Sequence, residues 1–262
     1  MRPPAVAGSF YPQDPQELRS AVEALLDGVP FQPDRSAPDR SFALVVPHAG
    51  YRWSGPTAAH AYARLAGRRD IERVVLLGPA HRVPLRGIAV PKLAHWSTPL
   101  GAVEIDTGGA ADLVAAGLAV ADDAPHAPEH ALEVQLPFLQ VLGFSKVLPV
   151  CVGAAAPDAV AALLSLVAGP GTLVLCSTDL SHYLTQEEAR AADEGTVDAV
   201  VRLEPGRIGE HGACGRYALR GLLTWARDLA PDVRVLHQAT SADEGGPRDR
   251  VVGYLAASLT AS

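Results

Sequence analysis

The chain has 262 residues, of which 48% are hydrophobic and 19% are charged, and its formal net charge is −7. This composition is typical of a soluble globular protein, and the acidic balance argues against sequence-independent binding to nucleic acid. No apolar run approaches the roughly 20 residues that span a bilayer, and the first residues lack the apolar core of a signal peptide. The three cysteines have no CxxC spacing, which favours a reducing, cytoplasmic compartment. We expect a single domain over residues 1–262.

The first elements predicted along the chain are a helix, a strand, a second helix and a second strand. Asp14 and Pro15 are a typical N-cap and first position of a helix. The apolar runs 42–46 and 74–77 end at Pro or Gly, as buried strands of a parallel sheet often do. The alanine-rich segment 55–65 is predicted as a helix between them. Strand, helix and strand in this order form a βαβ unit.

Strands and helices continue to alternate through the rest of the chain. The strands are predicted at 87–90, 147–152, 172–176 and 251–257, and the helices at 129–142, 157–167, 186–203 and 216–229. Pro137 is expected to kink or interrupt the first of these helices. The polar, proline-containing stretch 34–40 is expected to be a loop. The alternation predicts an α/β fold with a mostly parallel central sheet and helices on both faces.

Histidines follow two of the predicted strands directly. His48 comes after the run 42–46, and His81 comes after the run 74–77. A third strand leads into Asp179 and His182. Because parallel sheets bind their ligands outside the carboxyl ends of the strands, we expect these side chains at one edge of the sheet. A single strand-end histidine is more often a hydrogen-bonded structural residue than a ligand. Two of them, with a third strand that leads into Asp179 and His182, make the structural and the ligand interpretations about equal.

Cys214 is a further candidate ligand. It is flanked by glycines just before a predicted helix, whose dipole is expected to favour the thiolate. Two imidazoles and a thiolate suit iron, copper or zinc, with a position left open for water or substrate. Asp179 and His182 would then orient a ligand or transfer a proton. The alternative for Cys214 is a small buried core residue.

Three other residues are candidates for the pocket. Glu129 and His130 lie in the predicted helix, where His130 and Glu133 share one face at i, i+3 spacing. This spacing is only a weak indication of a metal site, and the side chains of Glu129, His130 and Glu133 could equally cap the helix. Tyr51 follows His48 closely and could line a pocket or pack in the core.

Seven short segments, in this order along the chain, resemble the Memo family. They are 7–12 (AGSFYP), 47–51 (PHAGY), 78–81 (GPAH), 98–101 (TPLG), 129–138 (EHALEVQLPF), 177–182 (STDLSH) and 214–215 (CG). The resemblance implies a fold similar to the catalytic subunit of class III extradiol dioxygenases, which use non-haem iron(II). It also implies that His48, His81 and Cys214 hold the metal, that Asp179 and His182 are pocket residues, and that His182 resembles the acid/base histidine of the dioxygenases. The dioxygenase relatives have a glutamate at the third ligand position. Bacterial members of the family often belong to a system with an AMMECR-type protein and a radical-SAM protein, which are therefore expected partners.

Three functions remain open from the sequence. The first is a redox or dioxygenase-like enzyme that uses Fe(II) or Cu at His48, His81 and Cys214. The second is a module without turnover that binds a peptide, a small ligand or a metal in the inherited pocket. The third is zinc-assisted hydrolysis, because two histidines and one cysteine with an open position also suit zinc-bound water.

Overall fold

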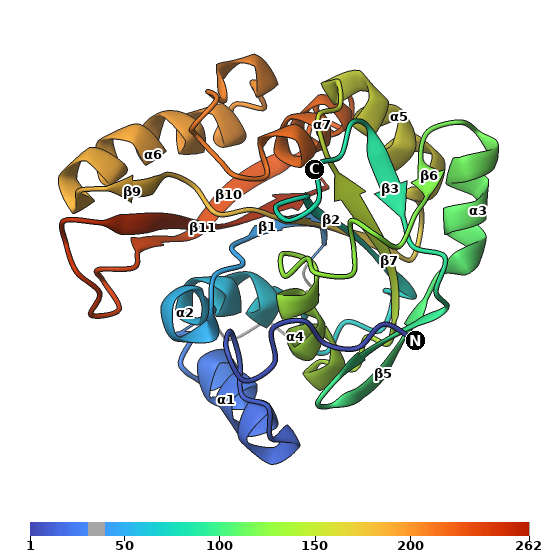
Figure 1. The fold of residues 1–262 in the computed structure, drawn as a ribbon. Coiled ribbons are helices and arrows are strands. Elements are labelled where there is room, and N and C mark those ends of the chain that lie inside the picture. Colours follow the sequence, from blue (N-terminus) through green and yellow to red (C-terminus); the bar gives the residue numbers. More distant parts are fainter. Residues whose placement is uncertain (31–39, 262) are drawn as a thin grey trace.

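The computed structural model describes residues 1–30 and 40–261 and arranges them as a central sheet between layers of helices (Figure 1). The predicted loop at 34–40 lies outside the described residues except for Arg40. The strands are β1 (Ser41–Val46), β2 (Arg73–Pro79), β3 (Ile88–Val90), β4 (His95–Thr98), β5 (Gly101–Ile105), β6 (Val120–Ala121), β7 (Lys146–Val152), β8 (Thr172–Ser177), β9 (His182–Leu184), β10 (Asp232–Thr240) and β11 (Val251–Thr260). The α-helices are α1 (Pro15–Asp27), α2 (Tyr51–Tyr62), α3 (Thr107–Ala115), α4 (Leu136–Val141), α5 (Pro157–Val167), α6 (Gln186–Val201) and α7 (Arg216–Arg227). Short 3-10 helices are η1 (Ala63–Leu65), η2 (Glu133–Gln135) and η3 (Pro205–Arg207).

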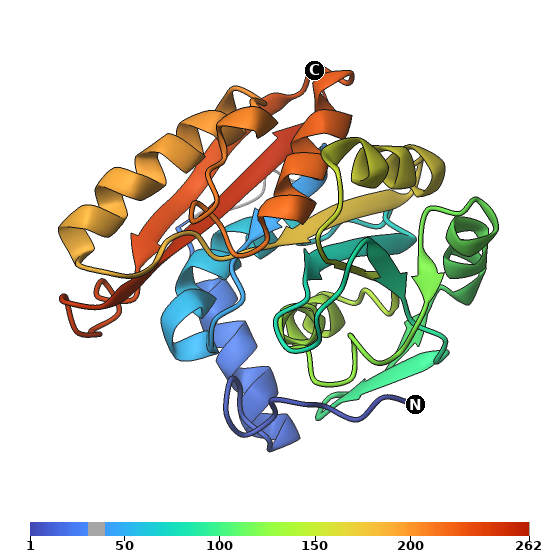
Figure 2. The ribbon, with the colours of Figure 1, turned by 45° about the horizontal axis from the view of Figure 1, so that its top comes forward.

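The centre of the sheet is parallel. In the described part of the chain, neighbouring strands follow the order β10-β11-β1-β8-β2-β7-β3-β6. β1, β8, β2 and β7 run parallel to one another, whereas β11 is antiparallel to both β1 and β10, and β3 is antiparallel to β7. The predicted α/β fold with a mostly parallel sheet is confirmed. Figure 2 shows α6 lying along the β10–β11 hairpin.

Helices cover both faces of the sheet because successive side chains of a strand point to opposite faces. In β1, Leu44 and Val46 belong to the hydrophobic core that includes residues of α1, α2 and α4. Ala43 and Val45 belong to the core that includes residues of α3, α5, α6 and α7. All four side chains are fully buried, so residues 43–46 of β1 form an uninterrupted apolar run, as in other two-sided parallel sheets. Over residues 1–30 and 40–261, no helix has both the length and the apolar character needed to cross a membrane.

The segment predicted as one helix over 129–142 folds differently. It begins as turns, followed by η2 and α4. Pro137 lies in the first turn of α4, where its missing N–H costs no hydrogen bond, so it begins this helix instead of kinking a longer one. Upstream, the Glu129 carboxylate accepts a hydrogen bond from the backbone two residues further on, which favours a turn. His130 and Glu133 therefore do not form the predicted pair on one helix face.

The apolar patterns also do not predict β4, β5, β6, β9 and β10. β10 is the longest of these strands and lies at an edge of the sheet, where most of its side chains are only partly buried or exposed. Its sequence consequently lacks the continuous apolar run by which the central strands are recognised.

A buried ion pair fixes the N-terminal segment to the turns before α4. Arg2 Nη1 donates to Glu133 Oε2 at 2.7 Å, and its other nitrogens donate to the carbonyl oxygens of His126 and Glu129. Glu133 also accepts hydrogen bonds from two N-terminal backbone N–H groups and from the Tyr11 hydroxyl. Both charged side chains are at least 97% buried, so removal of one would leave the other uncompensated.

We expect Glu133→Gln to lower the free energy of unfolding by about 3–5 kcal/mol, because the Arg2 charge would stay buried without its partner. Urea unfolding followed by circular dichroism measures this change. The matched control is Glu23→Gln, which removes the exposed partner of Arg19 and should cost less than about 1 kcal/mol. Equal, small losses in the two variants would show that the buried pair does not stabilise the fold.

Candidate metal centre

The register of the parallel strands brings the ends of β1, β2 and β8 to one level. Val45 of β1 and Leu77 of β2 pair with the same residue of β8. His48 lies three positions after Val45, and His81 lies four positions after Leu77. Asp179 lies three positions after Cys176, the residue of β8 that pairs with both strands. The three side chains predicted to share a sheet edge therefore start from the same level.

His48 is buried, and its hydrogen bonds determine which ring nitrogen is free. Its Nδ1 atom lies 2.9 Å from the Ser177 hydroxyl. That hydroxyl has one proton, which it donates to the Ala131 carbonyl at 2.7 Å, and it also accepts from the Gln135 amide. His48 Nδ1 is therefore the donor and Nε2 has the lone pair. Burial, together with the nearby His81, lowers the pKa of His48 well below its usual range, so the ring is neutral at pH 7.

Glu129 orients His81 in a similar way. Its Oε1 atom lies 2.9 Å from His81 Nδ1, and its Oε2 atom accepts from the His81 backbone N–H at 2.6 Å. Burial by itself raises the pKa of Glu129, but the hydrogen bonds from the ring and backbone of His81 and from the Ala131 N–H, with the electrostatic interaction with His81, lower that pKa to about 2. Since a carboxylate only accepts hydrogen bonds, His81 Nδ1 is the donor and Nε2 is left to bind a ligand.

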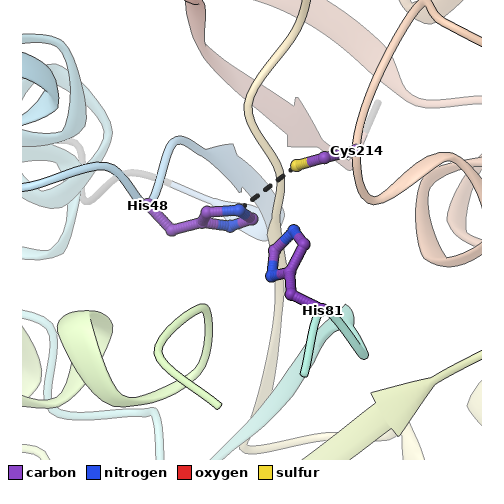
Figure 3. Close-up of side chains that lie close together, drawn as sticks. All are labelled: His48, His81 and Cys214. Atoms are coloured by element: carbon purple, nitrogen blue, oxygen red, sulfur yellow. Dashed lines mark hydrogen bonds between the residues drawn. The ribbon is translucent and has the colours of Figure 1, made fainter. Parts of the chain in front are cut away.

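Cys214 reaches the same point from the loop that precedes α7. Its sulfur lies 3.2 Å from His48 Nε2, and the side chains of His48, His81 and Cys214 converge in Figure 3. The sulfur accepts a hydrogen bond from the Asp179 backbone N–H at 3.3 Å, and the Cys214 N–H donates to the Asp179 carbonyl at 3.2 Å. For the chain by itself, the predicted preference of Cys214 for the thiolate is wrong. Burial and the Asp179 carboxylate raise the pKa of the thiol and outweigh the hydrogen bonds from Asp179, Thr178 and Gly215 that lower it.

The three side chains offer a donor set that fits a transition metal. One nitrogen from each of His48 and His81 and the sulfur of Cys214 lie within 4.8 Å of one another. Imidazole nitrogen and thiolate sulfur are ligands for iron, copper and zinc. Both imidazoles donate from Nδ1 to a neighbouring oxygen, which is the usual support of a metal-binding histidine. Donor atoms of His81, Glu129 and His130, one from each, also lie within this distance of one another, but His81 Nδ1 and Glu129 Oε1 already form a hydrogen bond with each other.

Asp179 and His182, predicted to transfer protons or orient a ligand, lie beside this group. Asp179 Oδ1 accepts from the His48 backbone N–H at 2.7 Å, and its Oδ2 lies 3.9 Å from His48 Nε2. Burial raises the pKa of Asp179. His182 Nδ1 lies 2.9 Å from the Leu180 carbonyl and must be the donor, so Nε2 is the acceptor in the neutral ring. His182 and Cys214 line one cavity.

The residues predicted for the pocket are divided between this group and the core. The His130 ring stacks on His81 with the centroids 4.8 Å apart and lies edge-on to His48 at 5.5 Å. Tyr51 instead donates its hydroxyl to the Val134 carbonyl at 2.7 Å and packs against Phe138. The structure brings Glu129 and His130 to the histidine cluster, whereas it places the Tyr51 side chain in the core.

The sequence patterns missed the polar residues that position the candidate ligands. Besides Ser177 and Gln135, Thr178 accepts from the Gly215 N–H at 2.9 Å and lies 3.7 Å from the Cys214 sulfur. A Cβ at Gly215 would lie 2.8 Å from Thr178, so only glycine lets this loop approach so closely. The sequence does contain one signal for them, which is the change from apolar residues to the hydroxyl residues Ser177 and Thr178 at the end of β8.

We expect Cys214 to react slowly with iodoacetamide at pH 8 in chelator-treated protein, because the thiolate is the reactive form and the pKa of this thiol is raised. The rate should increase as the pH rises and the thiol loses its proton. Peptide mass spectrometry measures the rate, with the urea-unfolded chain as the reference. Modification of the folded chain at the rate of the unfolded one would contradict the assigned effect of burial.

Comparison with known proteins identifies the family of the chain. The profile of a family described as Memo-like protein matches residues 2–258. A MEMO1 family protein of Sulfolobus acidocaldarius is 36% identical, with 97% of this chain and 98% of the relative covered. The corresponding proteins of Methanopyrus kandleri and Desulfurococcus amylolyticus are 36% and 33% identical, each with 97% of both chains covered.

Proposed function

Because the chain belongs to the Memo family, we propose that it binds a redox-active metal ion through Nε2 of His48, Nε2 of His81 and the sulfur of Cys214. The observation that carries this proposal is the convergence of the three donor atoms, from segments far apart in the sequence, within 4.8 Å of one another. The hydrogen bonds to both Nδ1 atoms support it, since they leave Nε2 as the free nitrogen of each ring.

Iron(II) or copper is the metal we propose. Bound at these residues, either would supply one-electron redox chemistry and a Lewis-acidic position for a substrate. His48 and His81 hold the ion as neutral ligands, and Cys214 adds a negative charge when it gives up its proton on binding. The buried Glu129 carboxylate, which bonds to His81, supplies a second negative charge close to the ion.

His182 and Asp179 are the residues that we propose for proton transfer and orientation. His182 is anchored through Nδ1, so its Nε2 can accept a proton in the cavity that it shares with Cys214. Asp179 fixes the backbone of His48 through one oxygen. Its raised pKa lets the carboxyl hold a proton at a higher pH than an exposed aspartate does.

We expect protein purified anaerobically to contain one iron or copper ion per chain, and His48→Ala and Cys214→Ser to lose most of it. Elemental analysis by mass spectrometry measures the content. His95→Ala is the matched control, because His95 is exposed on β4, and its metal content should stay unchanged. Unchanged metal in both site variants would refute the ligand assignment, and zinc without iron or copper would favour metal-assisted hydrolysis.

The second candidate is a module that binds a ligand or a metal without turnover. The observation that favours it is the third donor, which is the thiol of Cys214, whereas the resemblance to the extradiol dioxygenases implies a carboxylate at this position. The residues that hold the metal would be the same in the two cases. Proton transfer by His182 separates them, because a binding module does not need it.

We expect iron-loaded protein to consume oxygen with catechol as the probe, and His182→Ala to lower this rate by about 10²-fold or more while its iron content is unchanged. An oxygen electrode measures the rate, and His95→Ala serves again as the control. If iron-loaded wild-type protein takes up no more oxygen than metal-free protein, the binding module is the better description. Uptake above that background that is unchanged in His182→Ala would refute the proposed role of His182.

A further inference from the structure

A cavity of about 770 Å³ lies beside the metal centre on the side of Cys214. Its walls come from residues 180–184, from α6 and from residues 207–216. The described lining includes Cys214 and His182 but neither His48 nor His81, so a molecule in the cavity meets the centre at its sulfur ligand. The volume is that of a typical small-molecule site.

Basic side chains dominate the charged lining of this cavity, although the whole chain has a net charge of −7. The titratable or charged lining residues other than Cys214 and Tyr183 are His182, Arg207, His211, Arg216 and Glu210. Arg207 already has carboxylate partners, since its Nη1 donates to Asp198 at 2.6 Å and to Glu204 at 2.7 Å. The positive charge that a ligand could meet in this cavity therefore rests on Arg216.

Arg216 is held in place but retains free donors. Its guanidinium lies 4.5 Å from the centroid of the Tyr217 ring, and Nη2 donates to the Tyr217 hydroxyl at 3.2 Å. In the described part of the chain, the carboxylate opposite Arg216 is Glu210, with Oε1 3.9 Å from Nη2. That distance is too long for a hydrogen bond, and Glu210 is 76% exposed, so water screens the pair. Among residues 1–30 and 40–261, no hydrogen-bond acceptor is found for the remaining N–H groups of the guanidinium, which can therefore donate to a ligand.

We propose that this cavity binds an anionic group, a carboxylate or a phosphate, of the molecule on which the metal centre acts, and that Arg216 holds this group. A planar guanidinium can donate two parallel hydrogen bonds to either oxyanion. Arg216 follows Cys214 by two residues, so the anion and the sulfur ligand belong to one wall of the cavity. The chemical class of the substrate rests on the proposed function, whereas the anion site itself does not require the metal.

The test uses three probes of similar size on metal-free protein: benzoate, phenyl phosphate and the neutral benzyl alcohol. Each is titrated at constant ionic strength and followed by the backbone amide signals in NMR spectra. We expect at least one of the anions to shift signals of residues 181–184 and 209–216, and benzyl alcohol to leave them unchanged. Arg216→Gln should weaken anion binding at least about tenfold, and Arg216→Lys should weaken it less, because lysine keeps the charge but loses the planar fork.

Arg19→Gln is the matched control, because it removes the same charge from an exposed position on α1 and should bind the anions as wild type does. Tighter binding of benzoate would assign a carboxylate substrate, and tighter binding of phenyl phosphate would assign a phosphate; both support the site. The proposal is overturned if neither anion binds, if benzyl alcohol binds equally well, or if Arg216→Gln binds the anions as wild type does. If Arg216→Gln does not fold, Arg216→Lys is used in its place. The proposal is then overturned if Arg216→Lys binds the anions with wild-type affinity and the anions shift signals of residues outside the cavity.

The metal content of the same samples keeps the two proposals apart. Arg216→Gln should retain the metal of the wild type when purified anaerobically. Anion binding without any bound metal in the wild type would refute the proposed function and leave the anion site standing. Metal at His48, His81 and Cys214 without anion binding would refute the anion site and leave the proposed function standing.

Discussion

The site depends on the register of the parallel strands β1, β8 and β2. Backbone hydrogen bonds set this register, and they bring the strand ends that lead to His48, Asp179 and His81 to one level. A slip of one residue would move a strand end by about 3.3 Å. Such a shift is as large as the 3.2 Å between His48 Nε2 and the Cys214 sulfur, so the donors would no longer meet. The sheet therefore acts as the rigid frame of the centre.

Two buried carboxylates beside the centre have opposite properties because their partners differ. Glu129 accepts hydrogen bonds from the ring and backbone of His81 and from a further backbone N–H, and its pKa falls to about 2. Asp179 accepts from the His48 backbone, but burial prevails and raises its pKa. One carboxylate is thus a permanent negative charge that orients a histidine, and the other can exchange a proton. This division suits the proposed metal site, which would both hold a cation and exchange protons.

The sequence was sufficient for the parts of the site that follow from strand ends. His48 and His81 come directly after apolar runs, so their common edge could be predicted from the pattern. Cys214 could be placed beside a helix, but its contact with His48, 166 residues earlier, depends on the close approach of Gly215 to Thr178. The strength of its burial, which raises the pKa of the thiol, is likewise a tertiary property. The helix expected over 129–142 was wrong because side-chain hydrogen bonds and Pro137 set a later start.

Anomalous diffraction tests the central claim most directly. Crystals of anaerobically purified protein would be measured on both sides of the iron and copper absorption edges. The account predicts one anomalous peak, specific for one of these two metals, in contact with His48, His81 and Cys214. A metal peak bound by other residues, with these three side chains in contact with no metal, would contradict it.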